Sequence, residues 1–76
     1  MYIHEAIVAR TERMPLISRK SWAGNAYISD MPECWVCLSN LPEGCTFVSD
    51  HGRSMREGWI PSQDDLIAND WEPVGP

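Results

Sequence analysis

The sequence predicts a small α+β domain. We expect a short N-terminal helix, an antiparallel meander sheet, a short capped helix near the C-terminus and a last strand. Three observations support this: apolar residues at helical spacing in the first residues, a two-residue period with turn residues from Leu16 onward, and a helix-capping pattern at Ser62. With 76 residues the chain is expected to form a single domain over 1–76.

The first predicted element is an amphipathic helix over residues 3–14. Its apolar stripe consists of Ile3, Ala6, Ile7 and Met14. Arg10 lies on the same stripe, and we expect its long side chain to run along the edge of the buried face and keep its charge in water. Pro15 is expected to end the helix.

The middle of the chain reads as a series of short strands. Extended runs are predicted at Leu16–Arg19, Ala26–Ser29, Cys34–Leu38, Thr46–Ser49 and Ser54–Arg56. Turn residues separate them at Ala23–Asn25, Asp30–Glu33, Leu41–Gly44 and Asp50–Gly52. Helices would cover only one face of such a sheet. The other face would have to pack against another chain, which favours an oligomer.

The second predicted helix begins after Ser62. Ser62 is a good N-cap, and Asp65 stands three residues on as an acidic form of the capping box. Leu66 and Ile67 are expected to form the buried side of this helix, and Asn69 is expected to end it.

Two tryptophans bracket this helix. Trp59 ends the preceding extended run, and Trp71 lies in the last one, Asp70–Glu72, which Pro73 is expected to close. A helix N-terminus carries unpaired N–H groups and a partial positive charge. The stretch is therefore a candidate anion-binding site beside an indole ring.

Charge and composition limit the possible partners. The net charge of −5 argues against general binding to nucleic acid or to anionic membranes, because both need a cationic surface. The cations gather at Arg10, Arg13, Arg19, Lys20, Arg53 and Arg56, so a local cationic pocket remains possible. Four Trp and four Met are a large apolar content for so short a chain, and they favour assembly with a partner chain.

The sequence also indicates a compartment. No apolar run is long enough to span a membrane, and no N-terminal signal is recognised. Three cysteines, an odd number, do not fit a secreted disulfide framework. A cytoplasmic location is expected.

The cysteines form the most visible chemical pattern. Cys34 and Cys37 are spaced as in a zinc knuckle, with Cys45 and His51 behind them. However, the intervening Trp35–Val36 favours an extended strand, in which positions three apart face opposite sides. Buried apolar cysteines are therefore expected, and no metal or cofactor is predicted. A zinc-stabilised module remains an alternative.

The sequence contains only weak signals of a catalytic site. A cysteine could be paired with His4 or His51, but nothing nearby marks an oxyanion hole or an orienting third group. Asp64 and Asp65 are adjacent on a helix and so diverge, whereas carboxylates for acid–base chemistry should converge. We expect a protein that is not an enzyme.

Arginine and tryptophan residues form a more informative set. Arg19 and Trp22 are three residues apart at the end of the first strand, while Arg53 and Arg56 lead toward Trp59. A guanidinium can pair with a phosphate while an indole stacks on a nucleobase. Alternatively, the tryptophans serve only the core and the interfaces.

These residues carry a resemblance to a known family. Arg19-x-x-Trp22 and the run Trp59-Ile60-Pro61-Ser62-Gln63-x-Asp65-Leu66-x-Ala68-x-Asp70-Trp71-Glu72 resemble the Thoeris anti-defence family of the second type, which consists of small phage proteins. Ala6-Ile7 stands where that family carries an Ala-Leu-like pair in its first helix. The match frames both ends of the chain.

The resemblance implies a sponge rather than an enzyme. Members assemble, typically as tetramers, and bind a cyclic nucleotide immune signal in pockets between subunits. The signal is a cyclic ADP-ribose isomer or, in some members, a cyclic dinucleotide. The implied partners are that signalling molecule and further copies of the chain, in the cytoplasm of the bacterial host.

The resemblance also implies a ligand-binding set. Trp22 and Trp59 would stack on the base or ribose, and Arg19 or Arg56 would pair with phosphate. On this hypothesis, Trp22→Ala abolishes binding and leaves the assembly intact.

The remaining members of the set lie at the second helix. Ser62 and Asp65 would order the helix start or bond polar ligand atoms, with Asp65 favoured as the capping partner. Trp71 is assigned to the core or an interface. The alternative function is a small interaction module that docks on a host protein through an aromatic patch or a sheet edge.

Overall fold

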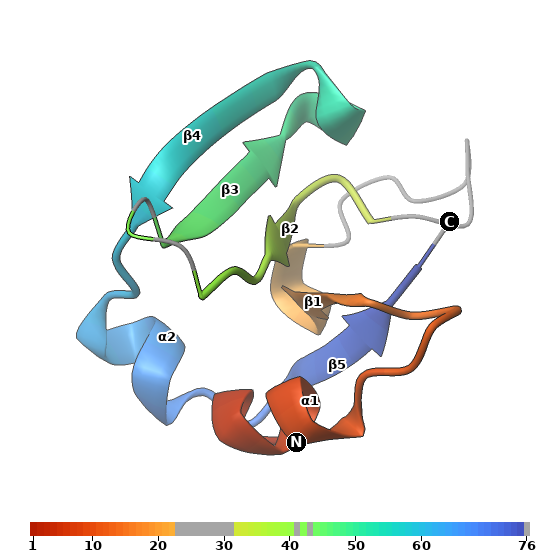
Figure 1. Cartoon of the computed structure of the whole chain (residues 1–76). Coiled ribbons are helices and arrows are strands. Elements are labelled where there is room, and N and C mark those ends of the chain that lie inside the picture. The colour runs from red at the N-terminus through yellow and green to blue at the C-terminus, as the bar shows by residue number, and fades with distance from the viewer. Residues whose placement is uncertain (23–31, 41, 43, 76) are drawn as a thin grey trace.

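The computed structural model describes residues 1–22, 32–40, 42 and 44–75 (Figure 1). Its elements are α1 (Ile3–Ala9), β1 (Leu16–Arg19), β2 (Trp35–Cys37), β3 (Cys45–Ser49), β4 (Ser54–Trp59), α2 (Gln63–Ile67) and β5 (Trp71–Val74). The predicted α+β class is confirmed, with both helices and the last strand in their expected places. Within the described ranges, no helix has the length and apolar character needed to cross a bilayer.

The strands form one sheet in the order β4-β3-β2-β1-β5, and all neighbours are antiparallel. The first four strands follow one another as a meander, as predicted. The last strand then returns to the far side of β1, where Leu16 pairs with Val74 and Arg19 with Trp71 (Figure 1). The first and last strands therefore lie side by side.

The N-terminal helix is shorter than predicted. It ends at Ala9, so the expectation of a helix to Met14 was wrong. Arg10 takes an extended conformation and its Nε donates to the Ile7 carbonyl at 3.0 Å. The backbones of Thr11 and Met14 then hydrogen-bond to each other at 3.2 Å in a tight turn. These local bonds replace the helical ones, and the exposed Arg10 side chain is confirmed.

The strand predictions were accurate in position and less so in length. β1 has the predicted bounds, and the Asp50–Gly52 turn joins β3 to β4 as expected. The predicted strand Ala26–Ser29 lies outside the described residues. The last strand runs through Pro73 to Val74, so the expectation that Pro73 closes it was wrong. Because β5 is an edge strand, the missing N–H of a proline leaves no inner partner unpaired.

The second helix confirms the capping prediction and corrects the packing prediction. The Ser62 side chain accepts from the Asp65 N–H, and the Asp65 carboxylate accepts from the Ser62 N–H, which completes a capping box. The helix is capped at Ala68, one residue before the predicted stop. Leu66 and Ile67 are 52% and 64% exposed, so the expectation that they form a buried side was wrong. Polar contacts through Asp65 anchor this helix instead, as described below.

The core lies between the sheet and α1. Its fully buried apolar residues are Ala6, Ile17, Val36 and Trp71. Ile17 pairs with both Val36 and Pro73, and directly opposite residues share a face, so β1, β2 and β5 point their apolar side chains the same way. Ala6 of α1 packs against that face. The assignment of Trp71 to the core is confirmed.

Candidate functional site

Four aromatic side chains gather on the helix-bearing face of the sheet. This aromatic cluster consists of Trp22, Phe47, Trp59 and Trp71. The Trp22 ring stands nearly perpendicular to its neighbours, with centroids 5.0 Å from Trp71, 5.4 Å from Phe47 and 6.4 Å from Trp59. Phe47 and Trp59 stack at 6.1 Å with an interplanar angle of 22°. Trp22 and Trp59 are only partly buried, so the cluster is both core and surface.

The register of β3 and β4 explains why these rings meet. Phe47 pairs with Arg56, and Cys45 pairs with Trp59, although strict alternation would place Arg56 and Trp59 on opposite faces. A register shift at Cys45 adds one residue to β4, and Gly58 takes up this residue with φ 69°. Glycine reaches that left-handed conformation without a Cβ clash. The bulge thereby turns Trp59 back onto the face of Phe47.

Arg56 lies at the border of the aromatic cluster. It is exposed and stands opposite Phe47 on the same face. Beside it is a cavity of about 360 Å³, here called the edge hollow, which is lined by Phe47, Ser49, Ser54, Met55 and Arg56. An aromatic ring, a guanidinium and two hydroxyls thus surround one open space. This set can stack on a base, pair with a phosphate and hydrogen-bond to sugar oxygens.

Arg19, by contrast, is held by carboxylates of its own chain. Its Nε donates to Asp70 at 2.8 Å and its Nη1 donates to Asp65 at 3.1 Å. The hydrogen bond to Asp70, helped by Asp65, raises the pKa of Arg19 against the opposing effect of burial. Burial alone would raise the pKa of Asp70, but hydrogen bonds from Arg19 and from the Ser21 amide outweigh it and lower that pKa.

The Arg19–Asp70 pair also positions Trp22. The Lys20 N–H donates to the Asp70 carbonyl at 2.9 Å, and the Ser21 N–H donates to the Asp70 carboxylate at 3.2 Å. These bonds fix the 3₁₀ turn Lys20–Trp22 that follows β1. Arg19 therefore stabilises the turn that positions Trp22. Two of its three side-chain nitrogens already donate hydrogen bonds to carboxylates of the same chain.

Asp65 joins α2 to the sheet. Its carboxylate accepts from Arg19 and from both the N–H and the hydroxyl of Ser62, at 3.0 to 3.1 Å. Its backbone carbonyl accepts from the Trp71 indole N–H at 2.8 Å. The predicted capping role of Asp65 is thus present, and the same residue tethers the helix to the core.

The predicted site residues therefore fall into two connected groups. Trp22, Trp59 and Arg56 meet around Phe47, whereas Arg19, Ser62 and Asp65 form the polar network that holds α2. Sequence reasoning missed three contributors: Phe47, Gly58 and Asp70. Phe47 is the one aromatic residue of β3, which could have identified it, but the bulge at Gly58 and the pairing of Asp70 depend on strand register.

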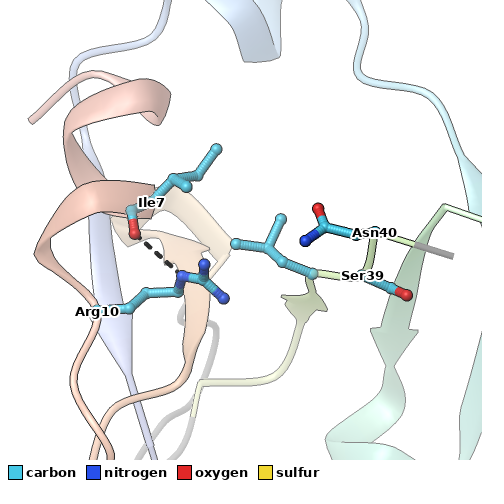
Figure 2. Close-up of a pocket in the computed structure, with 5 residues that line it drawn as sticks. Ile7, Arg10, Ser39 and Asn40 are labelled. Carbon is cyan, nitrogen blue, oxygen red and sulfur yellow. Dashed lines mark hydrogen bonds between the residues drawn. The ribbon is translucent and has the colours of Figure 1, made fainter.

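A second cavity lies at the end of α1. It has a volume of about 330 Å³ and is lined by Ile7, Arg10, Leu38, Ser39 and Asn40 (Figure 2). Ile7 and Arg10 approach it from the helix, and Ser39 and Asn40 approach it from the segment after β2. Arg10 donates to the carbonyls of Ile7 and Pro15, so its guanidinium is already hydrogen-bonded to the backbone at the end of the helix. We give this cavity no role in the candidate site.

The cysteines are free and partly buried. Burial, together with the nearby charge of Glu33, raises the pKa of Cys34, and burial also raises the pKa of Cys37, so both are neutral thiols at pH 7. In residues 1–22, 32–40, 42 and 44–75, no three His, Cys, Asp or Glu side chains are grouped so as to hold a metal ion. The zinc alternative gains no support from this geometry.

Comparison with known proteins agrees with the sequence resemblance. The family model described as Tad2-like, the Thoeris anti-defense 2-like domain, matches residues 1–74. No curated protein and no solved structure matches the chain.

Proposed function

The chain belongs to the Thoeris anti-defense 2-like family, whose role is phage anti-defence, and on this premise we propose that it sequesters a cyclic nucleotide immune signal without cleaving it. The signal would be a cyclic ADP-ribose isomer or a cyclic dinucleotide in the cytoplasm of the infected cell. Holding it starves the host effector of its activator.

The observation that carries this proposal is the aromatic cluster with Arg56 at its border. Trp22 and Trp59 keep part of their ring surface exposed, and Arg56 is exposed beside the edge hollow. A base or ribose would stack on the rings, and a phosphate would pair with the guanidinium. Of the two arginines expected to bind phosphate, Arg56 is the better candidate, since Asp65 and Asp70 already pair with Arg19.

Tight sequestration also needs a rigid site. The rings of the cluster pack against one another at 5.0 to 6.4 Å, and the polar network of Arg19, Asp65 and Asp70 fixes the turn that presents Trp22. A site that is ordered before binding loses less conformational entropy when the ligand arrives. This arrangement supports a sponge, which must hold its ligand more tightly than the effector does.

The direct test is calorimetric titration with cyclic ADP-ribose isomers and a panel of cyclic dinucleotides. We expect saturable binding to at least one of them, and recovery of that ligand intact after heat denaturation. Arg56→Ala should weaken binding by about 10- to 100-fold, because it removes charge-assisted hydrogen bonds to phosphate. Arg13→Ala, which removes an exposed cation from the turn before β1, is the matched control. Flat titrations across the panel, or a cleaved ligand, would refute the proposal.

We further propose that the protein works as a homo-oligomer, with a tetramer expected from the family resemblance. The fully buried apolar core is small, and large apolar side chains such as Ile60 remain exposed. Burying this surface against other copies would stabilise a domain of this size. Light scattering measures the mass, and a monomer at working concentration would contradict this part of the proposal.

A second candidate function is docking on a host protein. It is favoured by the exposed apolar residues at α2: Ile60, Leu66 and Ile67, which are 85%, 52% and 64% exposed. Exposed apolar side chains of this kind can pack against a partner surface. A docking module would release no nucleotide on heating after exposure to the signal, whereas a sponge would, and this observation separates the two functions.

A further inference from the structure

The cavity at the end of α1 contains a cation that forms no ion pair with a carboxylate in the described part of the chain. The Arg10 guanidinium donates to the carbonyl oxygens of Ile7 and Pro15, at 3.0 and 3.5 Å, and both acceptors are neutral. Across the described residues, the ion pairs with carboxylates all belong to Arg19. Arg10 is therefore a positive charge without a local counter-charge there, on a chain whose net charge is −5.

The bonds to the backbone leave part of the guanidinium available. Nε of Arg10 donates to Ile7 and Nη1 donates to Pro15, which leaves the donors of Nη2 and one donor of Nη1 for a ligand. Two N–H donors of one planar guanidinium match the two oxygens of a carboxylate. Because the backbone already holds the group in place, it loses less conformational entropy when a ligand binds.

The walls of the cavity are partly apolar. Ile7 and Leu38 line it, and both pack against the hydrophobic core, which fixes their positions. Asn40 lines it from the segment after β2, and its side chain points toward Arg10 (Figure 2). The volume of about 330 Å³ is at the lower end of the range for small-molecule sites. A cation, an amide and two apolar walls thus surround space for one small ligand.

We propose that this cavity binds a carboxylate carried on a short aliphatic group, with the carboxylate on Arg10 and the aliphatic group against Ile7 and Leu38. One guanidinium balances one negative charge. The carbonyl oxygens at the end of α1 carry partial negative charge and disfavour a second one, so a carboxylate fits better than a phosphate dianion. The Asn40 amide can donate a further hydrogen bond to the carboxylate.

This site is separate from the one proposed for the nucleotide. Its lining residues come from α1 and the segment after β2, whereas β3 and β4 supply most of the edge hollow, and the two cavities share no residue. The inference therefore does not depend on the function proposed above. Two sources present the required chemistry: a free short-chain acid, and the C-terminus of a polypeptide that ends in an aliphatic residue.

Titration of the natural chain with hexanoate, followed by two-dimensional NMR, tests the site. We expect saturable shifts at the amides of Ile7, Arg10 and Asn40, with a dissociation constant on the order of 1 mM for so small a ligand. Hexanamide has a similar shape without the charge and should bind at least about tenfold more weakly. Each CH₂ removed from hexanoate should weaken binding about two- to fourfold. Equal affinity for acid and amide, no saturation, or shifts confined to other residues would overturn the proposal.

Substitutions test the named residues. Arg10→Met keeps much of the aliphatic length and should abolish measurable binding of hexanoate. Arg13→Met, which removes an exposed cation from the turn before β1, is the matched control and should bind like the natural chain. Because Arg10 also bonds to the end of α1, circular dichroism checks that its variant is folded. Asn40→Ala, at an exposed position, should weaken binding about threefold to tenfold, and it decides the matter if Arg10→Met does not fold. Unchanged affinity in the deciding variant would overturn the proposal.

Two peptides distinguish the sources of the carboxylate. N-acetyl-Gly-Gly-Leu with a free C-terminus is compared with the same peptide amidated. Binding tighter than that of hexanoate, and lost on amidation, identifies a polypeptide C-terminus; weaker or equal binding identifies a free acid.

Competition separates this site from the proposed function. Hexanoate bound by a chain whose nucleotide titrations are flat keeps the carboxylate site and refutes the proposed function. A cyclic nucleotide that displaces hexanoate competitively would assign the cavity to the nucleotide and overturn the inference.

Discussion

The polar network behind the aromatic cluster gives the sharpest test of the fold, through Arg19→Met. Methionine keeps much of the aliphatic length of arginine but removes both charge-assisted hydrogen bonds. The Arg19 side chain is 20% exposed, and those of Asp65 and Asp70 are 16% and 29% exposed. At about 1 kcal/mol for each hydrogen bond, a low value chosen for partly solvated groups, the loss is about 2 kcal/mol.

A loss of about 2 kcal/mol is a large fraction of the stability of a chain of this length. A domain of this length has an unfolding free energy of roughly 4–11 kcal/mol. With a urea slope of about 1 kcal/mol per molar, the midpoint of unfolding should fall by about 2 M. Tryptophan fluorescence and far-UV circular dichroism measure it at one fixed protein concentration, because assembly makes stability depend on concentration. Lys20→Met removes the neighbouring exposed cation and should leave the midpoint nearly unchanged.

The natural chain and Arg19→Met should differ in unfolding free energy by an amount that depends on pH, because the pKa of Asp70 is lowered in the folded state. A carboxyl whose pKa is lower in the folded state stabilises the fold above its unfolded pKa of about 3.9. The contribution is lost as the pH falls through the lower, folded value. The gap between the natural chain and Arg19→Met should therefore narrow between pH 7 and about pH 2.5. A gap below about 0.5 kcal/mol at pH 7, or one unchanged at low pH, would refute this account of the network.

Two further substitutions test local geometry. Gly58→Ala should lower the unfolding free energy by about 1 kcal/mol because of the positive φ, and should weaken the near-UV circular dichroism by moving Trp59. Gly44→Ala, at another positive φ where an added Cβ meets no neighbouring atom, should cost a similar amount and leave that spectrum intact, and equal spectra would contradict the role of the bulge. Ser62→Ala should lower the unfolding free energy by about 1 kcal/mol through loss of the N-cap, whereas Gln63→Ala should change it by less than about 0.5 kcal/mol; equal effects would show that the cap contributes little.

Local signals in the sequence were enough for most of the fold. The capping box at Ser62 and the hairpin at Asp50–Gly52 each depend on a few neighbouring residues, and both are present. The predicted bounds of β1, Leu16–Arg19, agree with the structure. The length of the N-terminal helix was overestimated because the apolar stripe continues to Met14. Hydrophobic periodicity does not reveal the hydrogen bonds of Arg10 and Thr11 that compete with the helix.

The candidate site was harder to predict because its geometry depends on register. The tryptophans and arginines were recognised from their chemistry, but the sequence could not distinguish Arg19, held by Asp65 and Asp70, from Arg56, which is exposed beside Phe47. Asp70 lies far from Arg19 along the chain, and only the pairing of β1 with β5 brings them together. The exposure of Leu66 likewise depends on which group anchors α2.

The strand order has a consequence for how the chain folds. β1 is an inner strand whose second neighbour, β5, lies far from it along the chain, after all the other strands of the sheet. Contacts between such distant segments require a long loop to close first, which slows folding. Trp71 arrives with β5, and it lies beneath Trp22 and Trp59. A nascent chain whose β5 is still inside the ribosome therefore has neither the pairing of β1 with β5 nor a complete aromatic cluster.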